Sequence, residues 1–313
     1  MPRALLRVLR WSLALALVAA ALWALRGQHA AVREVMHTVQ PRWGRVTLAS
    51  LVVLLTYAFL IESWRRVLAE MGGHLSPLRA AHIWLVSNLA RYVPGSLWQL
   101  GAMGVMAQRQ GVALSISTGS AVVLTIVNVL TGLAVFALTS ARAPALGGKG
   151  IWFVALGVIA LVAAPFVLPR VGRLARSVTG RDIVMPSVGP RALVIAAAST
   201  TIAWLAYGVA FWILASAILP DGPRSLVSCI AVYTGSYLLG LLAVAPPAGL
   251  GVADGALVLL AQQFGVASVA EAGVLAIFVR IWRTVLEVLP GLIALAAGTA
   301  ADGDRAQRAL PDE

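Results

Sequence analysis

The last long apolar run of the chain, at 268–299, contains three charged residues near its middle. Arg280, Arg283 and Glu287 are three and four residues apart, so the 3.6-residue period of an α-helix places them on one face. Arg283 and Glu287 can pair, which leaves one basic charge on that face. Charges within a membrane span are costly and usually face a cavity or a partner. We interpret this face as functional; the alternative is a self-neutralised structural pair with Arg280 reaching toward the interface.

A fourth charged residue, Asp254, follows a stretch rich in proline and glycine at 245–251. Proline removes a backbone donor and glycine loosens a helix, so the apolar region 226–264 is predicted to form two short helices around a break. Asp254 then lies near the start of the second short helix, where an acid can act as a cap. It can equally pair with Arg280 or Arg283 across a cavity, or carry a coupling proton. The candidate site residues of this break are Pro247, Gly249, Gly251 and Asp254.

A similar interruption occurs earlier, within the apolar region 79–110. Arg91 precedes Pro94 and Gly95, and Trp98 and Gln99 follow them. An arginine beside the backbone amides of a half-helix N-terminus suits an anionic group such as a lipid phosphate. The alternative is that the arginine and tryptophan anchor a re-entrant hairpin at the membrane interface. Irregular backbone at membrane depth is tolerated only when it is buried in protein or lines a cavity.

The composition indicates that lipid surrounds these segments. The chain is 60% hydrophobic and 12% charged, against roughly 25% charged in an ordinary soluble domain. The net charge of +12 does not indicate nucleic-acid binding, because the arginines flank apolar runs as they do in membrane proteins. The single cysteine, Cys229, excludes an internal disulfide. H-E-x-x-H, G-x-S-x-G and Walker A motifs are absent from the sequence, so we expect no enzyme activity, cofactor or metal.

The apolar runs predict an all-α polytopic membrane protein. Residues 1–25 combine basic residues with an apolar run, which indicates an uncleaved first span, although a signal peptide has the same features. Each further run approaches or exceeds the roughly 20 residues that cross the hydrocarbon core. They lie at 46–64, 112–139, 151–169, 191–219 and 268–299. The fold is therefore about six full spans plus two broken or re-entrant helix pairs, or eight or more spans if each broken region crosses twice.

The arginines favour one orientation of these spans. They concentrate in alternate connections, which the positive-inside rule assigns to the cytoplasm. Both termini are then cytoplasmic in a bacterial cytoplasmic (inner) membrane. The connection 26–45 disagrees, because it holds four arginines on the predicted outer side; an interfacial amphipathic helix would explain it.

A repeat relates the two broken regions. The heptapeptide Ala-Gln-Arg-Gln-Gly-Val-Ala at 107–113 recurs as Ala-Gln-Gln-Phe-Gly-Val-Ala at 261–267. The same offset of 154 residues superimposes the breaks and the long spans that follow them. An odd number of crossings separates the copies, so we predict two inverted repeats, a pattern that marks transporter sites at the membrane midplane. A duplicated scaffold without transport is the alternative. The divisions are a first span at 1–25, repeat 1 at 46–139, a linking span and cytoplasmic loop at 151–190, repeat 2 at 200–299 and a cytoplasmic tail at 300–313.

The two breaks also resemble a known family. The segments Arg91–Trp98 and Pro247–Asp254, followed by Arg280, resemble the lysylphosphatidylglycerol synthase transmembrane-region family of flippase-like integral membrane proteins. The resemblance covers about residues 10–298. The second motif of that family usually reads P-x-G-x-G-x-x-E, so Asp254 is a shorter acid than the usual one. The family implies multi-pass proteins that translocate lipids between leaflets. Some members carry a cytoplasmic transferase domain after the membrane part; this chain ends at Glu313 without one, so we expect no aminoacylation of lipids.

These observations predict a lipid flippase in the cytoplasmic membrane. A cavity between the repeats would let an anionic phospholipid or lipid-linked headgroup cross while the acyl chains stay in lipid. Arg91, Arg280 and Arg283 would hold the headgroup, and Asp254 and Glu287 would balance charge. The expected partners are membrane lipids and a partner enzyme of a lipid pathway. The alternatives are a structural or regulatory subunit of an envelope-lipid or glycan pathway, and a lipid-linked-sugar transferase.

Overall fold

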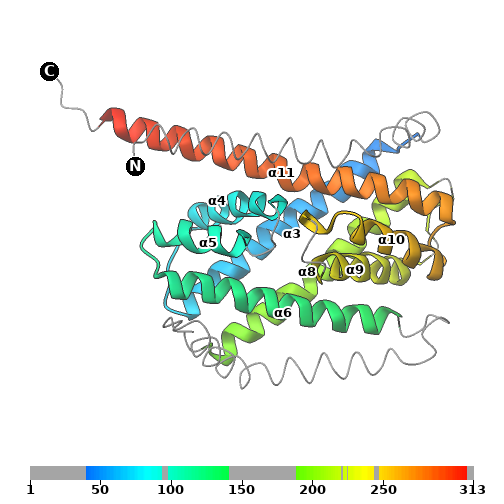
Figure 1. The fold of residues 1–313 in the computed structure, drawn as a ribbon, viewed down its shortest axis with the longest axis horizontal. Coiled ribbons are helices and arrows are strands. Elements are labelled where there is room, and N and C mark those ends of the chain that lie inside the picture. Colours follow the sequence, from blue (N-terminus) through cyan, green and yellow to red (C-terminus); the bar gives the residue numbers. More distant parts are fainter. Residues whose placement is uncertain are drawn as a thin grey trace.

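The computed structural model describes residues 40–93, 98–140, 188–219, 221–223, 225–242 and 247–308, and these residues form helices, turns and short connections (Figure 1). Eight α-helices and two 3₁₀ turns occur in these ranges. Three of the helices are long and apolar enough to span a membrane: α3 (Trp43–Glu70), α6 (Leu114–Ser140) and α8 (Pro190–Ile218). The prediction of an all-α, multi-pass membrane protein is therefore confirmed. The predicted first span at 1–25 and the linking span at 151–169 lie outside the described residues.

Each broken region consists of two short helices, as predicted. In the first, α4 (Pro77–Asn88) continues into a 3₁₀ turn, η1 (Leu89–Tyr92), and α5 (Trp98–Gln108) follows the break. In the second, α9 (Leu226–Leu242) is followed by η3 (Pro247–Gly249) and α10 (Val252–Gln263). Pro94 and Gly95 lie outside the described residues.

The repeated heptapeptide forms the same turn in both places. After α5, Gly111 has a φ of +86°, and the Val112 amide donates to the Ala107 carbonyl at 3.2 Å. After α10, Gly265 has a φ of +64°, and the Val266 amide donates to the Ala261 carbonyl at 2.8 Å. Glycine adopts this left-handed backbone without steric cost, which explains why it ends both helices.

The longest packing interface joins α3 to α8, which run antiparallel. The start of α3 lies beside the end of α8, because the Arg42 amide donates to the Ala217 carbonyl at 3.0 Å. Twenty residues further along α3, the Ser63 and Ser199 hydroxyls are 2.5 Å apart. The two helices therefore cross the molecule side by side in opposite directions (Figure 1).

The remaining helices bring the two breaks together. α4 packs against α11 (Val269–Arg308), α9 packs against α6, and the turns η1 and η3 contact each other. α11 lies very close to α4, since a Cβ added to Gly291 would be 2.9 Å from the Leu85 carbonyl oxygen. The two interruptions thus meet beside the middle of α11 (Figure 1).

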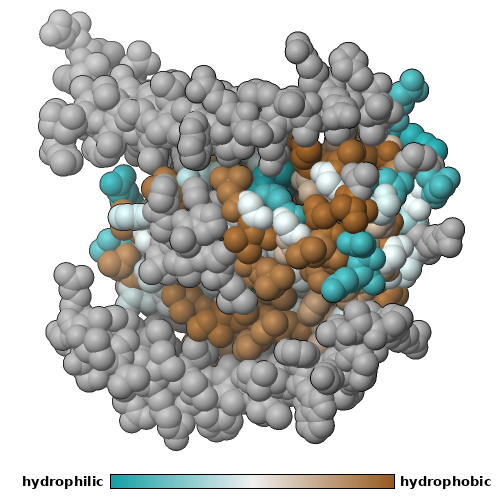
Figure 2. Space-filling model, turned by 45° about the vertical axis from the view of Figure 1, so that its right-hand side comes forward, coloured by the Kyte–Doolittle hydropathy of each residue, from teal (hydrophilic) through white to brown (hydrophobic). Residues whose placement is uncertain are grey.

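Large apolar side chains cover the outside of these helices. Figure 2 shows hydrophobic residues over most of the described part of one face. On α3 the exposed residues follow a helical stripe and include Leu48, Leu51, Leu55 and Phe59. In a soluble protein such a surface would be an aggregation hazard, whereas here it is the surface that faces lipid.

Candidate functional site

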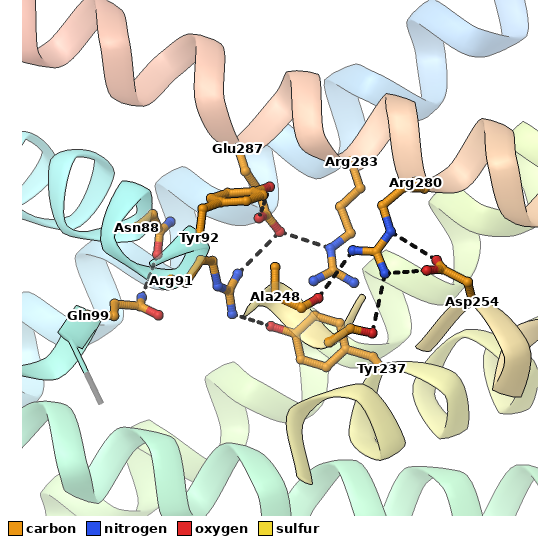
Figure 3. A network of polar contacts seen from close by, with 11 residues as sticks. Asn88, Arg91, Tyr92, Gln99, Tyr237, Ala248, Asp254, Arg280, Arg283 and Glu287 are labelled. Atoms are coloured by element: carbon orange, nitrogen blue, oxygen red, sulfur yellow. Dashed lines mark hydrogen bonds and ion pairs between the residues drawn. The ribbon is translucent and has the colours of Figure 1, made fainter. Parts of the chain in front are cut away.

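The Glu287 carboxylate of α11 lies at the centre of a buried polar network. Only 3% of its side chain is exposed. Its Oε1 accepts from the Arg283 Nε at 2.9 Å and is 3.2 Å from the Arg91 Nη1, while its Oε2 accepts from the Tyr92 hydroxyl at 2.8 Å (Figure 3). The predicted pairing of Arg283 with Glu287 is confirmed. The same carboxylate also links α11 to the turn η1 at the first break.

Arg91 connects this carboxylate to α9. Its Nη2 donates to the Tyr237 hydroxyl at 2.8 Å, and the Arg283 guanidinium carbon lies 4.5 Å from the centre of the Tyr237 ring. A guanidinium over an aromatic face is attracted by the ring quadrupole. Tyr237 was not predicted as a site residue, because a tyrosine in an apolar helix looks like a core aromatic until its neighbours are known.

Arg280 of α11 forms an ion pair and hydrogen bonds with residues of the second break. Its Nε and Nη2 donate to the two Asp254 carboxylate oxygens at 2.9 and 2.6 Å. Its guanidinium also reaches the backbone carbonyls of Ala248 at 3.2 Å and Gly249 at 3.4 Å (Figure 3). A planar guanidinium suits such forked recognition, whereas a lysine ammonium does not.

Asp254 combines two of its predicted roles. Besides pairing with Arg280, its Oδ2 accepts from the Gly251 amide at 2.9 Å, which caps the first turn of α10. The pairing with Arg280 and the cap are therefore both confirmed. Transfer of a proton by Asp254 stays a prediction.

The backbone at the second break requires its glycines. Gly249 and Gly251 have φ values of +67° and +78°, and Ala248 has a φ of +50°. A Cβ on Gly249 would be 2.7 Å from the Gly240 carbonyl oxygen, closer than van der Waals contact allows. Pro247 begins the 3₁₀ turn η3. This irregular backbone presents carbonyl oxygens to Arg280 and not to lipid, as expected of a broken helix.

Two of the predicted residues lie apart from the charged network. The Gln99 Nε2 donates to the Asn88 Oδ1 at 2.5 Å, which ties α5 to α4 across the first break. The Trp98 side chain is 60% exposed. The structure therefore brings together Arg91, Asp254, Arg280, Arg283 and Glu287, and it places Gln99 beside them and Trp98 at the surface.

The network carries an excess of positive charge. Three guanidinium groups face two carboxylates. Asp254 is matched by Arg280, so the excess falls on Arg91 and Arg283, which share Glu287. Both of these arginine side chains are less than one-fifth exposed. A cationic surplus in a buried site favours an anion as the missing partner.

A cavity of about 140 Å³ lies beside Arg91. Side chains from both broken regions and from α3, α6 and α8 line it, and they include Asn88, Gln99, Asn128 and Tyr237. A smaller space of about 20 Å³ separates Arg280 and Arg283 from α9. Within the described ranges, no three His, Cys, Asp or Glu side chains are placed to hold a metal ion.

One family model matches the part of the sequence that contains this site. The family model described as the lysylphosphatidylglycerol synthase transmembrane region matches residues 11–291. The chain belongs to this family. The match includes both breaks and every candidate site residue from Arg91 to Glu287, and it associates the chain with lipid metabolism. No curated protein matched the chain.

Proposed function

We propose that this member of the lysylphosphatidylglycerol synthase transmembrane-region family is a flippase that moves an anionic phospholipid or lipid-linked headgroup between membrane leaflets. One observation supports this proposal above the others. Where two helix breaks meet inside an apolar helical body, three largely enclosed arginines face two carboxylates among the described residues. Enclosed charges with a purely structural role would be expected to balance, because an uncompensated buried charge is costly.

A phosphate can take the place of Glu287 at Arg91. The guanidinium already uses two of its nitrogens, one for Glu287 and one for Tyr237, and it recognises phosphate oxygens with the same forked geometry. A lone charge at the membrane centre costs about 2.5–3.5 kcal/mol on insertion scales. In the absence of lipid, pairing with Glu287 lowers this cost for Arg91. While a lipid crosses the membrane, its headgroup phosphate would pair with Arg91 and keep the cost low.

The proposed architecture is a pair of inverted repeats. Exchanging α3 with α8, α4 with α9, α5 with α10 and α6 with α11 turns the set of main helix contacts into itself: α6 with α9, for example, becomes α11 with α4. The equivalent helices α3 and α8 run antiparallel, as expected when the two-fold axis is perpendicular to them, in the plane of the membrane. Such repeats can rock about a central site to expose it to either side.

The cellular setting follows from the charge distribution. We place the protein in a bacterial cytoplasmic membrane with both termini in the cytoplasm, because its arginines concentrate in alternate connections. An enzyme that makes or consumes the lipid would be its partner. The chain itself is proposed to be a transporter without catalytic activity.

Reconstitution in liposomes tests the function. Fluorescently labelled phosphatidylglycerol in the outer leaflet is quenched by dithionite, and the protected fraction reports movement. We expect movement above that of protein-free vesicles, and a loss of at least tenfold in its rate for Arg91→Gln. The matched control is Arg109→Gln, which removes an exposed arginine from the end of α5. Absence of movement for several anionic lipids would refute the proposal, as would an Arg91→Gln protein as active as the wild type.

A further inference from the structure

The cavity beside Arg91 is lined mostly by uncharged polar and aromatic side chains. Among the described residues that line it, Arg91 is the one with a formal charge. By the measure in which one water needs about 10–15 Å³, a cavity of about 140 Å³ takes on the order of ten waters. A group the size of a polyol or a single sugar ring fits such a space.

Several polar groups at this cavity have no hydrogen-bond partner among the described residues. The Asn128 side-chain amide of α6 and the hydroxyls of Tyr57 and Tyr207 make no hydrogen bond within the described part of the chain. Tyr57 is itself only 9% exposed. Enclosed polar groups are normally satisfied by protein, water or a ligand, so this wall of the cavity presents donors and acceptors to an occupant.

Aromatic rings supply a further part of the wall. Trp84, Trp204 and Tyr237 join the two tyrosines around the cavity, and their faces offer apolar contact to C–H groups. A ring of aromatics can also bind a quaternary ammonium group. That occupant is disfavoured here, because the Arg283 guanidinium already stacks on Tyr237 and the lining carries Arg91 without a carboxylate.

We propose that this cavity binds an uncharged, polyhydroxylated headgroup whose phosphodiester sits on Arg91. The hydroxyls of the headgroup bond to the free amide and phenol groups, and its C–H faces lie on the aromatic rings. This inference deepens the proposed flippase function and rests on it, since it names the class of lipid that the same site takes. Cationic and zwitterionic headgroups are discriminated against by the uncompensated positive charge.

Lipid binding to the purified full-length protein tests the headgroup independently of movement. Native mass spectrometry in detergent compares four lipids with identical acyl chains: phosphatidylglycerol, phosphatidylinositol, phosphatidylmethanol and phosphatidylcholine. Phosphatidylmethanol is the matched reference, because it carries the same single phosphodiester charge without hydroxyls. Neutral hydrogen bonds contribute about 0.5–1.5 kcal/mol each, so two or three of them predict at least about fivefold tighter binding of the two polyol lipids than of phosphatidylmethanol.

Variants assign the preference to the cavity. Asn128→Leu and Tyr207→Phe should each reduce the polyol preference about threefold or more while leaving phosphatidylmethanol binding unchanged. Arg91→Gln should weaken all three anionic lipids. Thr139→Val is the control on the same helix, because its hydroxyl bonds only to backbone carbonyls of its own helix.

The outcomes separate the two proposals. Equal affinity for phosphatidylmethanol and the polyol lipids, or binding of phosphatidylcholine as tight as that of phosphatidylglycerol, overturns the headgroup assignment even if lipids are flipped. A polyol preference that Asn128→Leu and Tyr207→Phe abolish supports the assignment even in a protein that moves no lipid, and in that case the flippase function fails by itself.

Discussion

Replacing Glu287 by glutamine isolates the energetic role of the central carboxylate. The substitution keeps the size of the side chain and an oxygen that can accept from Tyr92. It removes the negative charge between Arg91 and Arg283. Two guanidinium groups, each less than one-fifth exposed, then face each other without a counter-ion.

The expected cost is large for a single-atom change. Breaking a buried ion pair by removing one partner costs about 3–5 kcal/mol, because it leaves an uncompensated charge. With a shift of about 2 °C per kcal/mol for a chain of this size, the midpoint of thermal unfolding should fall by at least about 6 °C. Adding Arg91→Gln to Glu287→Gln removes one of the two guanidinium groups that lack a counter-ion. The unfolding midpoint of the double variant should therefore lie above that of Glu287→Gln alone.

Thermal unfolding of the purified protein in detergent, followed by tryptophan fluorescence, measures these shifts. Glu70→Gln is the matched control, since Glu70 is 30% exposed and pairs with Arg191, which is 79% exposed. Surface pairs contribute about 0–1 kcal/mol, so that variant should shift the midpoint by at most about 2 °C. Equal shifts for the Glu287 and Glu70 variants would refute the buried-charge reasoning, as would a double variant that shows the full sum of the two single losses.

Three further substitutions test other parts of the structure. Gly249→Ala should lower the unfolding midpoint by several degrees, because its backbone is left-handed and a Cβ would meet a carbonyl oxygen of α9 at 2.7 Å; an unchanged midpoint would contradict the close approach. Arg280→Lys should lose most transport in the dithionite assay, since one ammonium cannot bridge Asp254 and two backbone carbonyls, and wild-type rates would show that the charge alone suffices. Ser63→Cys with Ser199→Cys should form a disulfide on mild oxidation, seen as a gel-mobility shift after proteolysis between α3 and α8, because their hydroxyls are 2.5 Å apart; failure to crosslink would contradict the antiparallel contact.

Local sequence rules were sufficient for the breaks and for the charged face of α11. Proline and glycine disfavour a continuous helix and predicted both breaks, although the pair Pro290 and Gly291 lies inside α11 without ending it. The spacing of Arg283 and Glu287 brings them together on any α-helix. The cap formed by Asp254 follows from the same local geometry, because the acid sits in the first turn of α10.

Tertiary packing decided the rest of the site. The sequence placed Arg91 next to the first break but contained no sign that its guanidinium would reach Glu287, which is 196 residues away. Tyr237 and the cavity residues Tyr57, Asn128 and Tyr207 come from four different helices. These residues meet only because of how the four helices pack. The spacing of apolar residues in a sequence does not predict which neighbouring helix a polar side chain of a span will face.

In the proposed architecture of two inverted repeats, the charges of the site belong almost wholly to one copy. At the offset of 154 residues, the positions equivalent to Arg280, Arg283 and Glu287 are occupied by Ile126, Val129 and Leu133. A perfectly symmetric pair of inverted repeats would make its inward-open and outward-open states equivalent by a two-fold rotation, and therefore equal in free energy. Here the ion pairs tie the second break to α11 and have no counterpart at α6, so exchanging the conformations of the two halves produces a state of different energy. Under the proposed function, a two-fold scaffold would therefore have a one-sided resting state, and a lipid that competes for these ion pairs would change the balance between the two states.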